Sequence, residues 1–368
     1  MAQRQGTLEA LVSNSSLPRP NFWRGRTVFI TGHTGFKGSW LSLWLHSMGA
    51  NLVGYSKDIP TDPSLFESFG LKDLMVDLRG DVTDLPSLTK AIADAKPDIV
   101  LHLAAQSLVR LSYSTPVETY ATNVMGTVNV LEAARHTSSV KLALMVTSDK
   151  CYENREWIWS YRETDPMGGF DPYSSSKGCS ELVSAAYARS FAADPNGIRI
   201  LSARAGNVIG GGDWALDRLI PDLMRGLISG NPLHIRSPHS IRPWQHVLEP
   251  LSGYLVLTEK AFEDVALASQ GWNFGPGSDS EQTVATIANR VCDLWPNPKG
   301  WVDVSDPKQV HEAHLLKLDS TKARIQLGWV PRWSLEDALD ASVQFYRDHA
   351  AGGNMQAFGL KQIAAYTA

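Results

Sequence analysis

The chain has 368 residues, of which 43% are hydrophobic and 20% charged, a composition typical of one large or two unequal globular domains. Disordered and fibrous classes are excluded. The formal net charge of −4 provides no general attraction to nucleic acids or to anionic membranes. Any phosphate recognition must therefore be local, and a small anionic ligand is the expected partner.

The cysteine count and the amino terminus indicate where the protein works. Cys151, Cys179 and Cys292 are an odd number without paired short spacings, which argues against a disulfide framework and against a structural zinc site. Residues 1–21 form a polar leader without an apolar segment of signal-peptide length, and no run of about 18 apolar residues follows. We expect a cytoplasmic protein that binds no membrane and no nucleic acid.

Strand-like and helix-like segments alternate after the leader. The strands are expected at 27–30, 51–55, 99–104, 142–148 and 198–204, with helices at 37–48, 86–95, 117–135 and 173–190. Such alternation predicts βαβ units and a parallel sheet. Because the strands are nearly continuous apolar runs, helices should cover both faces of the sheet. The expected fold class is α/β, a doubly wound parallel sheet.

A smaller lobe is expected after Asn207, where the sequence becomes rich in glycine, arginine and tryptophan. A helix at 244–260 and a strand at 272–275 could return to the main sheet, so the two parts should be interleaved. We assign 22–208 plus 242–275 to a dinucleotide-binding domain and 209–241 plus 276–350 to a substrate-binding lobe. Residues 351–368 are expected to form a loosely ordered tail.

A glycine-rich loop follows the first strand and opens into an apolar helix. Glycines there allow a tight turn, close approach to a pyrophosphate and helix–strand packing, while the helix N-terminus faces the anion. The GxxGxxG spacing resembles the extended branch of the short-chain dehydrogenase/reductase family, which implies a Rossmann-like fold and a nicotinamide cofactor. The cofactor-binding candidates of this loop are Gly32, His33, Thr34, Gly35, Phe36, Lys37 and Gly38.

The second strand should end in an acidic residue that holds the adenosine ribose. Asp58 could do so and favours NAD, although Lys57 could instead accept the 2′-phosphate of NADP. We expect NAD. The resemblance further implies an adenine-contacting turn and a strand that passes under the cofactor, whose alanines could equally serve close packing; the residues are Asp81, Val82, Leu103, Ala104 and Ala105.

Tyr173 and Lys177 are four residues apart at the start of an expected helix, so they share one face of it. There the ammonium can favour the phenolate and hold the nicotinamide ribose. A phenolate so placed can accept a hydroxyl proton while a hydride leaves the same carbon. A tyrosine and a lysine at this spacing are common on surface helices, but their place after the strand at 142–148 favours a catalytic pair.

Ser148, Asp149 and Lys150 follow the fourth strand at its carboxyl end, where α/β enzymes carry their chemistry. A reductase needs a hydroxyl here, which Ser148 supplies. Asp149 and Lys150 are additional, and the alternative is a solvated charge pair. In sugar-nucleotide 4,6-dehydratases an aspartate at this place acts as the acid on the C6 hydroxyl, and the next residue is usually glutamate. Lys150 departs from that pattern.

The motifs GHTGFKGSWL, TSDKCYEN and LDSTKARIQLGWVP together resemble the CDP-glucose 4,6-dehydratase family, from about Trp23 to residue 348. The resemblance implies that Tyr173 removes the 4-hydroxyl proton while a hydride passes from C4 to NAD⁺. Asp149 would then protonate the departing C6 hydroxyl, and the hydride would return to C6. The product, CDP-4-dehydro-6-deoxyglucose, would serve deoxysugar synthesis for bacterial surface polysaccharide.

The Lys150 amine allows two hypotheses. Either it is neutral and removes the C5 proton itself, which we favour, or it stays charged and stabilises the C4 enolate while water or Tyr173 takes the proton.

The substrate-binding candidates come from the resemblance and from chemistry suited to a nucleoside diphosphate and a hexose. They are Gln106, Ser107, Asn207, Arg218 and Arg242. Each arginine taken alone is more often a surface charge. The run His311-Glu312-Ala313-His314 does not have HExxH spacing, so no metal site is expected.

Two other functions remain open. A nucleotide-sugar 4-epimerase shares Tyr173 and Lys177 but needs no acid after the serine, and a non-catalytic NAD(P)-sensing regulator would typically lack the tyrosine or the lysine. The resemblance also implies a homodimer that pairs the helices near 117–135 and 173–190. Their exposed faces should carry apolar residues such as Val128, Leu131, Leu182 and Ala186.

Overall fold

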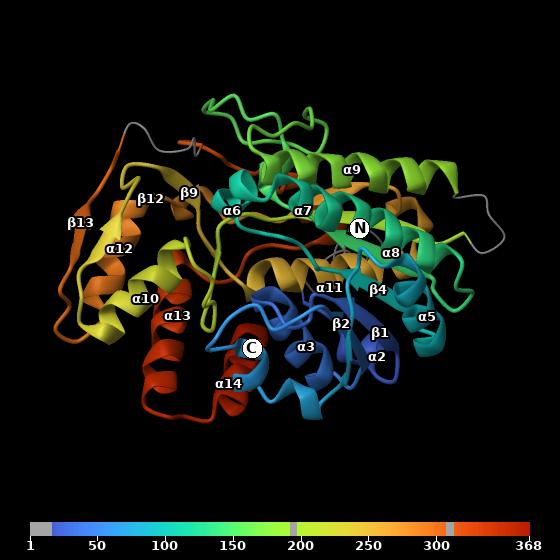
Figure 1. Ribbon diagram of the computed structural model, residues 1–368, viewed down its shortest axis with the longest axis horizontal. Helices are drawn as coiled ribbons and strands as arrows, with labels where there is room; N and C mark the ends of the chain where they lie inside the picture. Colours follow the sequence, from blue (N-terminus) through green and yellow to red (C-terminus); the bar gives the residue numbers. More distant parts are fainter. Residues whose placement is uncertain (1–16, 192–196, 307–312) are drawn as a thin grey trace, which may run out of the picture.

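A seven-stranded parallel sheet forms the centre of the computed structural model, which describes residues 17–191, 197–306 and 313–368 (Figure 1). Its order is β11-β6-β5-β4-β1-β2-β3, and every neighbouring pair is parallel. The strands are β1 (Thr27–Thr31), β2 (Asn51–Ser56), β3 (Val76–Arg79), β4 (Ile99–His102), β5 (Leu142–Val146), β6 (Arg199–Arg204) and β11 (Gly271–Asn273). This arrangement confirms the expected Rossmann-like, doubly wound α/β class.

Helices cover both faces of the sheet because successive strand residues point to opposite sides. In β1, Val28 and Ile30 belong to a core under α3 (Phe36–Ser47) and α11 (Leu248–Glu263). Phe29 between them belongs to a second core under α5 (Leu85–Ala95) and α8 (Gly126–Arg135). The long helix α9 (Pro172–Ser190) packs beside α8 and against β6.

The elements expected from the sequence are present within a few residues of their predicted bounds. The helix expected at 117–135 is divided into α7 (Pro116–Tyr120), a π-helical segment η2 (Ala121–Met125) and α8. Strand β3 was not expected. It lies at the sheet edge, and Val76 at its start is 55% exposed, so the segment lacks the apolar run that marks the central strands.

A second lobe built from short strand pairs and helices lies beside the carboxyl edge of the sheet. Here β7 (Val208–Ile209) pairs with β10 (Gln245–His246), β8 (Leu233–Ile235) with β13 (Trp301–Asp303), and β9 (Ile241–Pro243) with β12 (Glu281–Thr283). The helices are α10 (Leu219–Ser229), α12 (Val284–Asp293) and α13 (Leu335–Ala350).

Short turns of helix complete the fold: α2 (Pro20–Trp23), α4 (Leu65–Ser68), η1 (Leu71–Asp73), α6 (Val109–Ser114), η3 (Asp149–Cys151), η4 (Val265–Leu267), η5 (Ser278–Ser280) and η6 (Ala323–Leu327). All seven strands of the main sheet come from the two segments assigned to the dinucleotide-binding domain. Over the described parts of the chain, no helix combines the length and the apolar character that crossing a membrane would take.

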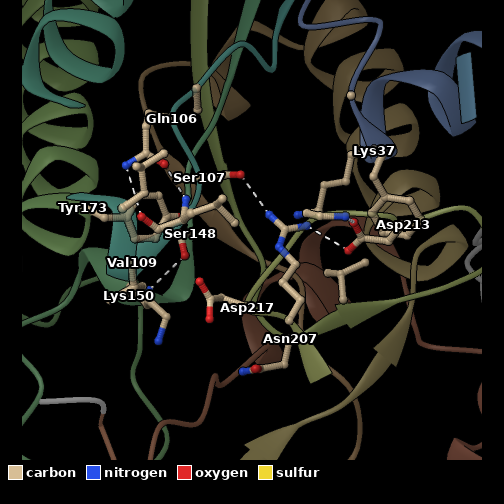
Figure 2. Close-up of a pocket in the computed structure, with 18 of the residues that line it drawn as sticks. Lys37, Gln106, Ser107, Val109, Ser148, Lys150, Tyr173, Asn207, Asp213 and Asp217 are labelled. Carbon is tan, nitrogen blue, oxygen red and sulfur yellow. Dashed lines mark hydrogen bonds and ion pairs between the residues drawn. The ribbon is translucent and has the colours of Figure 1, made fainter. Parts of the chain in front are cut away.

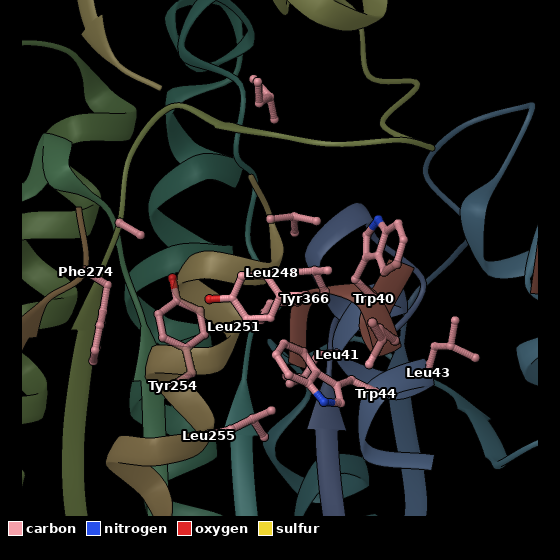
Figure 3. Close-up of a cluster of buried hydrophobic side chains, with 14 of the residues drawn as sticks. Trp40, Leu41, Leu43, Trp44, Leu248, Leu251, Tyr254, Leu255, Phe274 and Tyr366 are labelled. Atoms are coloured by element: carbon pink, nitrogen blue, oxygen red, sulfur yellow. The ribbon is translucent and has the colours of Figure 1, made fainter. Parts of the chain in front are cut away.

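The expectation of a loosely ordered tail was wrong, because residues 355–367 form helix α14 (Met355–Thr367), which packs against α3 and α13. The ring of Tyr366 is fully buried and meets Trp44 edge to face at 5.7 Å (Figure 3). Its hydroxyl donates to Oε2 of the buried Glu249 at 2.7 Å. The segment is ordered because it carries its own apolar face onto the core.

The end of the leader is also held in place, while residues 1–16 lie outside the described part. The backbone N–H and the Nε of Arg19 donate to the carboxylate of Glu259, a buried residue of α11, at 2.7 and 2.9 Å. The Trp23 indole donates to the same carboxylate at 2.6 Å. Thus both described ends of the chain are fastened to α11.

Replacing Tyr366 by phenylalanine should lower the free energy of unfolding by about 1–3 kcal/mol, because it leaves a buried carboxylate without one donor. Urea denaturation of both proteins measures the difference. Lys361→Ala, at an exposed position of the same helix, should change stability by no more than about 0.5 kcal/mol. An equal loss in both variants would show that the Tyr366–Glu249 bond adds nothing beyond helix formation.

Candidate active site

A cleft with a volume of about 1470 Å³ runs along the carboxyl edge of the sheet and continues between the sheet and the second lobe. The glycine-rich loop, the segments after β4, β5 and β6, and the start of α9 line it. Parallel strands place their carboxyl ends on one edge, where α/β proteins bind ligands. The cleft therefore lies where the sequence motifs were expected to meet.

The glycine-rich loop makes a turn that no larger residues could make. Gly32 has a φ of +74°, and a Cβ there would lie 2.6 Å from the Ala104 nitrogen on the neighbouring strand end. A Cβ on Gly38 would lie 2.1 Å from the Gly32 carbonyl oxygen. The loop backbone thus packs against the start of α3. The residues of the loop between these two glycines that line the cleft are Thr34, Gly35, Phe36 and Lys37.

His33 is the one loop residue that does not line the cleft. Its ring is fully buried, with Nε2 2.8 Å from Asp77 and Nδ1 2.9 Å from the Ser56 hydroxyl. Burial lowers the pKa of this ring despite the contact with Asp77. The ring also fills the space beside Gly54, where a Cβ would lie 2.4 Å from it. The His33 side chain therefore joins the loop to β2 and β3.

Lys37 reaches the catalytic end of the cleft. Its Nζ lies 3.4 Å from the Tyr254 hydroxyl, and burial lowers its pKa to about 7, with Arg218 acting in the same direction and Asp149 in the opposite one. The side chain is drawn beside that of Asp213 in Figure 2. The Lys37 side chain thus interacts electrostatically with Arg218, Asp149 and Lys177.

The residues expected in the adenine-contacting turn and under the cofactor also line the cleft, namely Asp81 and Val82 of the turn and Leu103, Ala104 and Ala105 after β4. Lys57 Nζ lies 3.1 Å from the Asp81 carboxylate, and this contact raises the pKa of the lysine. The Thr34 hydroxyl donates to the Asp58 carbonyl at 2.7 Å. Lys57 is therefore paired with an acid of the turn after β3.

Tyr173 and Lys177 lie in the first two turns of α9, both buried and both lining the cleft. The helix starts where Asp171 accepts from the Ser174 backbone N–H at 2.9 Å. Burial raises the pKa of Tyr173 to about 12, and a hydrogen bond with Ser148 acts against this rise. Burial lowers the pKa of Lys177 to about 8, and the nearby Glu181 acts against that fall.

Ser148, Asp149 and Lys150 follow β5 and line the cleft. Figure 2 shows Ser148 beside Tyr173, with Lys150 next to them. The Ser148 hydroxyl donates to Asp149 Oδ1 at 2.9 Å, and it accepts from the Lys150 backbone N–H at 3.2 Å. Asp149 is 1% exposed, and its Oδ2 has no hydrogen-bond partner among the described residues. A buried acceptor of this kind is ready for a ligand hydroxyl.

Gly206 makes room for that carboxylate. A Cβ at position 206 would lie 1.7 Å from Asp149 Oδ2. The next residue, Asn207, has a φ of +45°, and its buried Nδ2 finds no acceptor in the described parts of the chain. Both the acid and the amide thus keep a buried polar atom that has no partner among the described residues.

Arg218 spans the cleft. Its Nη2 donates to the Ser107 hydroxyl at 2.8 Å on the dinucleotide-binding side, and its Nη1 lies 2.9 Å from the carboxylate of the buried Asp213 in the second lobe (Figure 2). Arg218 and Ser107 were expected here from the sequence, whereas Asp213 was not. The glycine run before it, Gly210-Gly211-Gly212, was a signal that the chain approaches another element closely there.

The remaining substrate-binding candidates also line the cleft. The side chain of Gln106 donates to the Leu108 carbonyl and the Thr119 hydroxyl, so it shapes the loop after β4. Arg242 is 7% exposed and donates to the Ile241 and His314 carbonyls. An ion-paired group at the outer end was not anticipated, in which Asp217 lies 2.7 Å from Arg236 and 3.9 Å from Arg110.

Among the described residues, no three His, Cys, Asp or Glu side chains lie close enough together to bind a metal ion. His311 and Glu312 of the run considered above lie outside the described residues.

Comparisons with known proteins identify the family. Residues 29–341 match the family described as GDP-mannose 4,6 dehydratase. A CDP-glucose 4,6-dehydratase from Salmonella typhimurium is 52% identical over 94% of this chain and 97% of its own length.

Two solved structures share the fold at lower identity. DesIV, a dTDP-glucose 4,6-dehydratase from Streptomyces venezuelae solved with NAD bound, has a TM-score of 0.76 at 23% identity and covers 90% of this chain and 99% of its own. A UDP-glucose 4-epimerase from Thermotoga maritima has a TM-score of 0.76 at 22% identity, covering 88% and 99%. The two structures, at less than 25% identity, establish the fold alone. The family model and the 52% identical relative also establish the family. The chain belongs to the GDP-mannose 4,6-dehydratase family.

Proposed function

We propose that this protein converts CDP-D-glucose to CDP-4-dehydro-6-deoxy-D-glucose and water with NAD as its cofactor, a step of deoxysugar synthesis. The observation that carries the proposal is the cluster of Ser148, Asp149 and Tyr173, in which a buried acid with an unpartnered oxygen lies beside a phenol and a hydroxyl. A 4-epimerase has no use for that acid. The name of the 52% identical relative supports the choice of CDP-glucose.

The residues present fit NAD. The loop from Gly32 to Gly38 can hold the pyrophosphate at the N-terminus of α3, where a side chain at Gly38 would fill the turn. Lys57 is paired with Asp81, which leaves it poorly placed to select a 2′-phosphate. Lys177 can hold the nicotinamide ribose. When bound here, NAD would supply the chemistry of hydride acceptance from C4 and of hydride return to C6.

Tyr173 would accept the proton of the 4-hydroxyl group. Ser148, hydrogen-bonded to this phenol, would hold the substrate oxygen, and the Lys177 ammonium one turn along α9 would favour the phenolate. Asp149 would donate a proton to the departing C6 hydroxyl. Ser148 donates to only one of its oxygens, so the other is available to that hydroxyl.

The substrate phosphates fit the second lobe. Arg218 offers a guanidinium fork already oriented by Asp213, and Arg242 lines the same cleft. The unpartnered Asn207 amide can donate to the diphosphate. Gln106 and Ser107 border the sugar from the opposite wall.

We also propose that the protein is a homodimer that pairs α7, η2 and α8 with α9. Leu182 and Ala186 are exposed on α9, while Val117 and Met125 are 76% and 51% exposed on the neighbouring segment. Two residues expected on this face differ, since Leu131 is fully buried in the core beneath α8 and Val128 is half-buried. The apolar face is therefore set by Val117 and Met125 instead.

The cytoplasm is the compartment that we propose, because Cys151, Cys179 and Cys292 are all free thiols, as a reducing compartment would keep them. Fractionation of cells that express the protein should place it with a cytoplasmic marker. Recovery with a periplasmic or membrane marker would contradict this.

Incubation with CDP-glucose, dTDP-glucose, UDP-glucose and GDP-mannose in parallel should give a 4-keto-6-deoxy product from CDP-glucose only, detected by mass loss of one water. Tyr173→Phe should bind NAD but lose about 10²- to 10⁴-fold in turnover, because the hydroxyl proton then has no acceptor. A C4 epimer of unchanged mass would contradict the proposed reaction, and faster turnover of another nucleotide sugar would contradict the substrate.

Lys150→Met should keep hydride transfer from C4 but lose C5 chemistry. In deuterium oxide, we expect NADH to form in a single turnover while deuterium entry at C5 and loss of water fall together by about 10²-fold, since the amine is the proposed C5 base. Lys150→Arg keeps the charge but is a poor base, so full recovery in that variant would favour stabilisation of the enolate. Normal dehydration by the methionine variant would leave Lys150 without a role in catalysis.

Leu182→Glu should convert the dimer to a monomer at micromolar concentration, because it places charges in an apolar interface. Light scattering gives the mass of both proteins. Val265→Glu is the matched control, since Val265 is 66% exposed outside the proposed interface. A monomeric wild-type protein would refute the interface.

A further inference from the structure

Behind the catalytic residues lies a buried acid that the proposed reaction does not use. Glu181 is 4% exposed on α9, one turn after Lys177 and two turns after Tyr173. Its Oε2 accepts from the Ser202 hydroxyl at 2.6 Å and from Arg204 Nη2 at 2.7 Å, and its Oε1 accepts from the Thr147 hydroxyl. Burial alone would raise the pKa of Glu181, but Arg204 and these donors outweigh it, so the group is ionised.

The three donors come from the strand ends that carry the reacting groups. Thr147 immediately precedes Ser148 and Asp149. Ser202 and Arg204 lie on β6, which leads into Gly206 and therefore into the space that Asp149 occupies. One carboxylate thus ties α9 to the ends of β5 and β6.

Arg204 extends the connection to β11. Its Nη1 donates to the Tyr152 hydroxyl at 2.6 Å, and that hydroxyl donates to Asn273 Oδ1 at 2.7 Å. Asn273 is fully buried in β11. Because these groups are fixed at both ends, the Glu181 carboxylate has little freedom to move relative to Lys177.

We propose that Glu181 is a positioning residue, which acts through Lys177 and Thr147 to keep the Lys177 ammonium charged and in register with Ser148 and Asp149. Lys177 is 6% exposed, and its Nζ lies 3.4 Å from the Val146 carbonyl. Burial favours the neutral amine, and the anion of Glu181 one turn away opposes this.

Other charged and titratable groups also face Lys177. Lys37 from α3 and the buried His102 from β4 interact with it, as does the Cys151 thiol after β5, and Tyr173 lies one turn before it. Of these, Cys151 also acts to raise the pKa of Lys177, but burial keeps the pKa of that thiol well above its usual value. Near neutral pH, Glu181 is therefore the anion that sustains the Lys177 charge.

The direct test is an NMR titration of Lys177 in protein labelled with ¹³C at lysine Cε. The resonance is assigned by its absence in Lys177→Met. In Glu181→Gln, the pKa of Lys177 should fall by about one pH unit or more, because the opposing anion is gone and Arg204 is left unpaired. This readout needs neither NAD nor a nucleotide sugar, so it does not depend on the proposed function.

A kinetic test, which does rest on the proposed function, measures single-turnover NADH formation from CDP-glucose against pH. The decline at high pH, where Lys177 loses its proton, should move to lower pH in Glu181→Gln, and the rate at pH 8 should fall about fivefold, because far fewer molecules then carry the Lys177 charge. If wild type forms no NADH, the proposed function fails and the titration still decides the inference.

The matched control is Glu249→Gln. Glu249 is 1% exposed and accepts from the Arg332 and Trp333 backbone N–H groups and from Tyr366, but it lies on α11 and is not bonded to α9. This variant should lose stability without moving the Lys177 titration. An equal movement in both variants, or none in Glu181→Gln, would overturn the proposal.

A second pair of variants decides the matter if Glu181→Gln does not fold. Thr147→Val removes the bond from Glu181 to the strand that carries Ser148 and Asp149. Its control is Thr258→Val, which removes a buried hydroxyl of α11 that donates to the Tyr254 carbonyl and is not bonded to Glu181. NADH formation should slow about fivefold or more in the first, since misplaced acid–base groups lose much of their effect, and stay near wild type in the second. Equal rates in the two would overturn the proposal.

Discussion

The close approach of backbone to backbone at the carboxyl edge of the sheet is the constraint on which the rest of this protein depends. At Gly32 and Gly38 the first loop folds against the end of β4 and onto itself, with no room for a Cβ at either position. At Gly206 the absence of a side chain leaves room for the Asp149 carboxylate beside the end of β6. Larger side chains at these points would separate the two halves of the site.

The electrostatics of the site follow from that compactness. Lys37, Lys177 and Tyr173 all have pKa values moved by burial toward their neutral forms. Charges in such a place persist only where a partner opposes the loss of water. Glu181 beside Lys177 and Asp213 beside Arg218 are partners of this kind. The chain therefore uses buried acids to maintain cations near a ligand that is itself anionic.

Most of the fold could be predicted from the sequence because central parallel strands are apolar on both faces and the helices between them are periodic. The failures occur where tertiary contacts override local pattern. Strand β3 lies at the edge and has little apolar character, and α14 is ordered by the contact of Tyr366 with Glu249 and Trp44. Glu249 and Trp44 lie far from Tyr366 in the sequence, so local patterns did not predict that α14 is ordered.

The site was predictable where a motif fixes both residue type and spacing, as for Tyr173 and Lys177. The site was harder to predict where a side chain of a loop can point either into the cleft or into the core. His33 stands within the phosphate loop, yet its ring turns inward to Asp77 and Ser56. Glu181 was missed because its partner Arg204 becomes a neighbour only through the fold. Asp213 was missed because the five residues to its partner Arg218 run through irregular structure, where spacing predicts no contact. Spacing indicates which residues share a helix face, but not what that face meets.

The position of α14 has a consequence for how the protein is made. Trp44 of α3 is covered by Tyr366 of α14, and β11 at the outer end of the sheet comes only at residues 271–273. A nascent chain on the ribosome therefore exposes the apolar surface of α3 until α14 has left the exit tunnel. Synthesis that stops between β11 and α14 would release a complete sheet with an uncovered core, a species suited to recognition by chaperones and proteases.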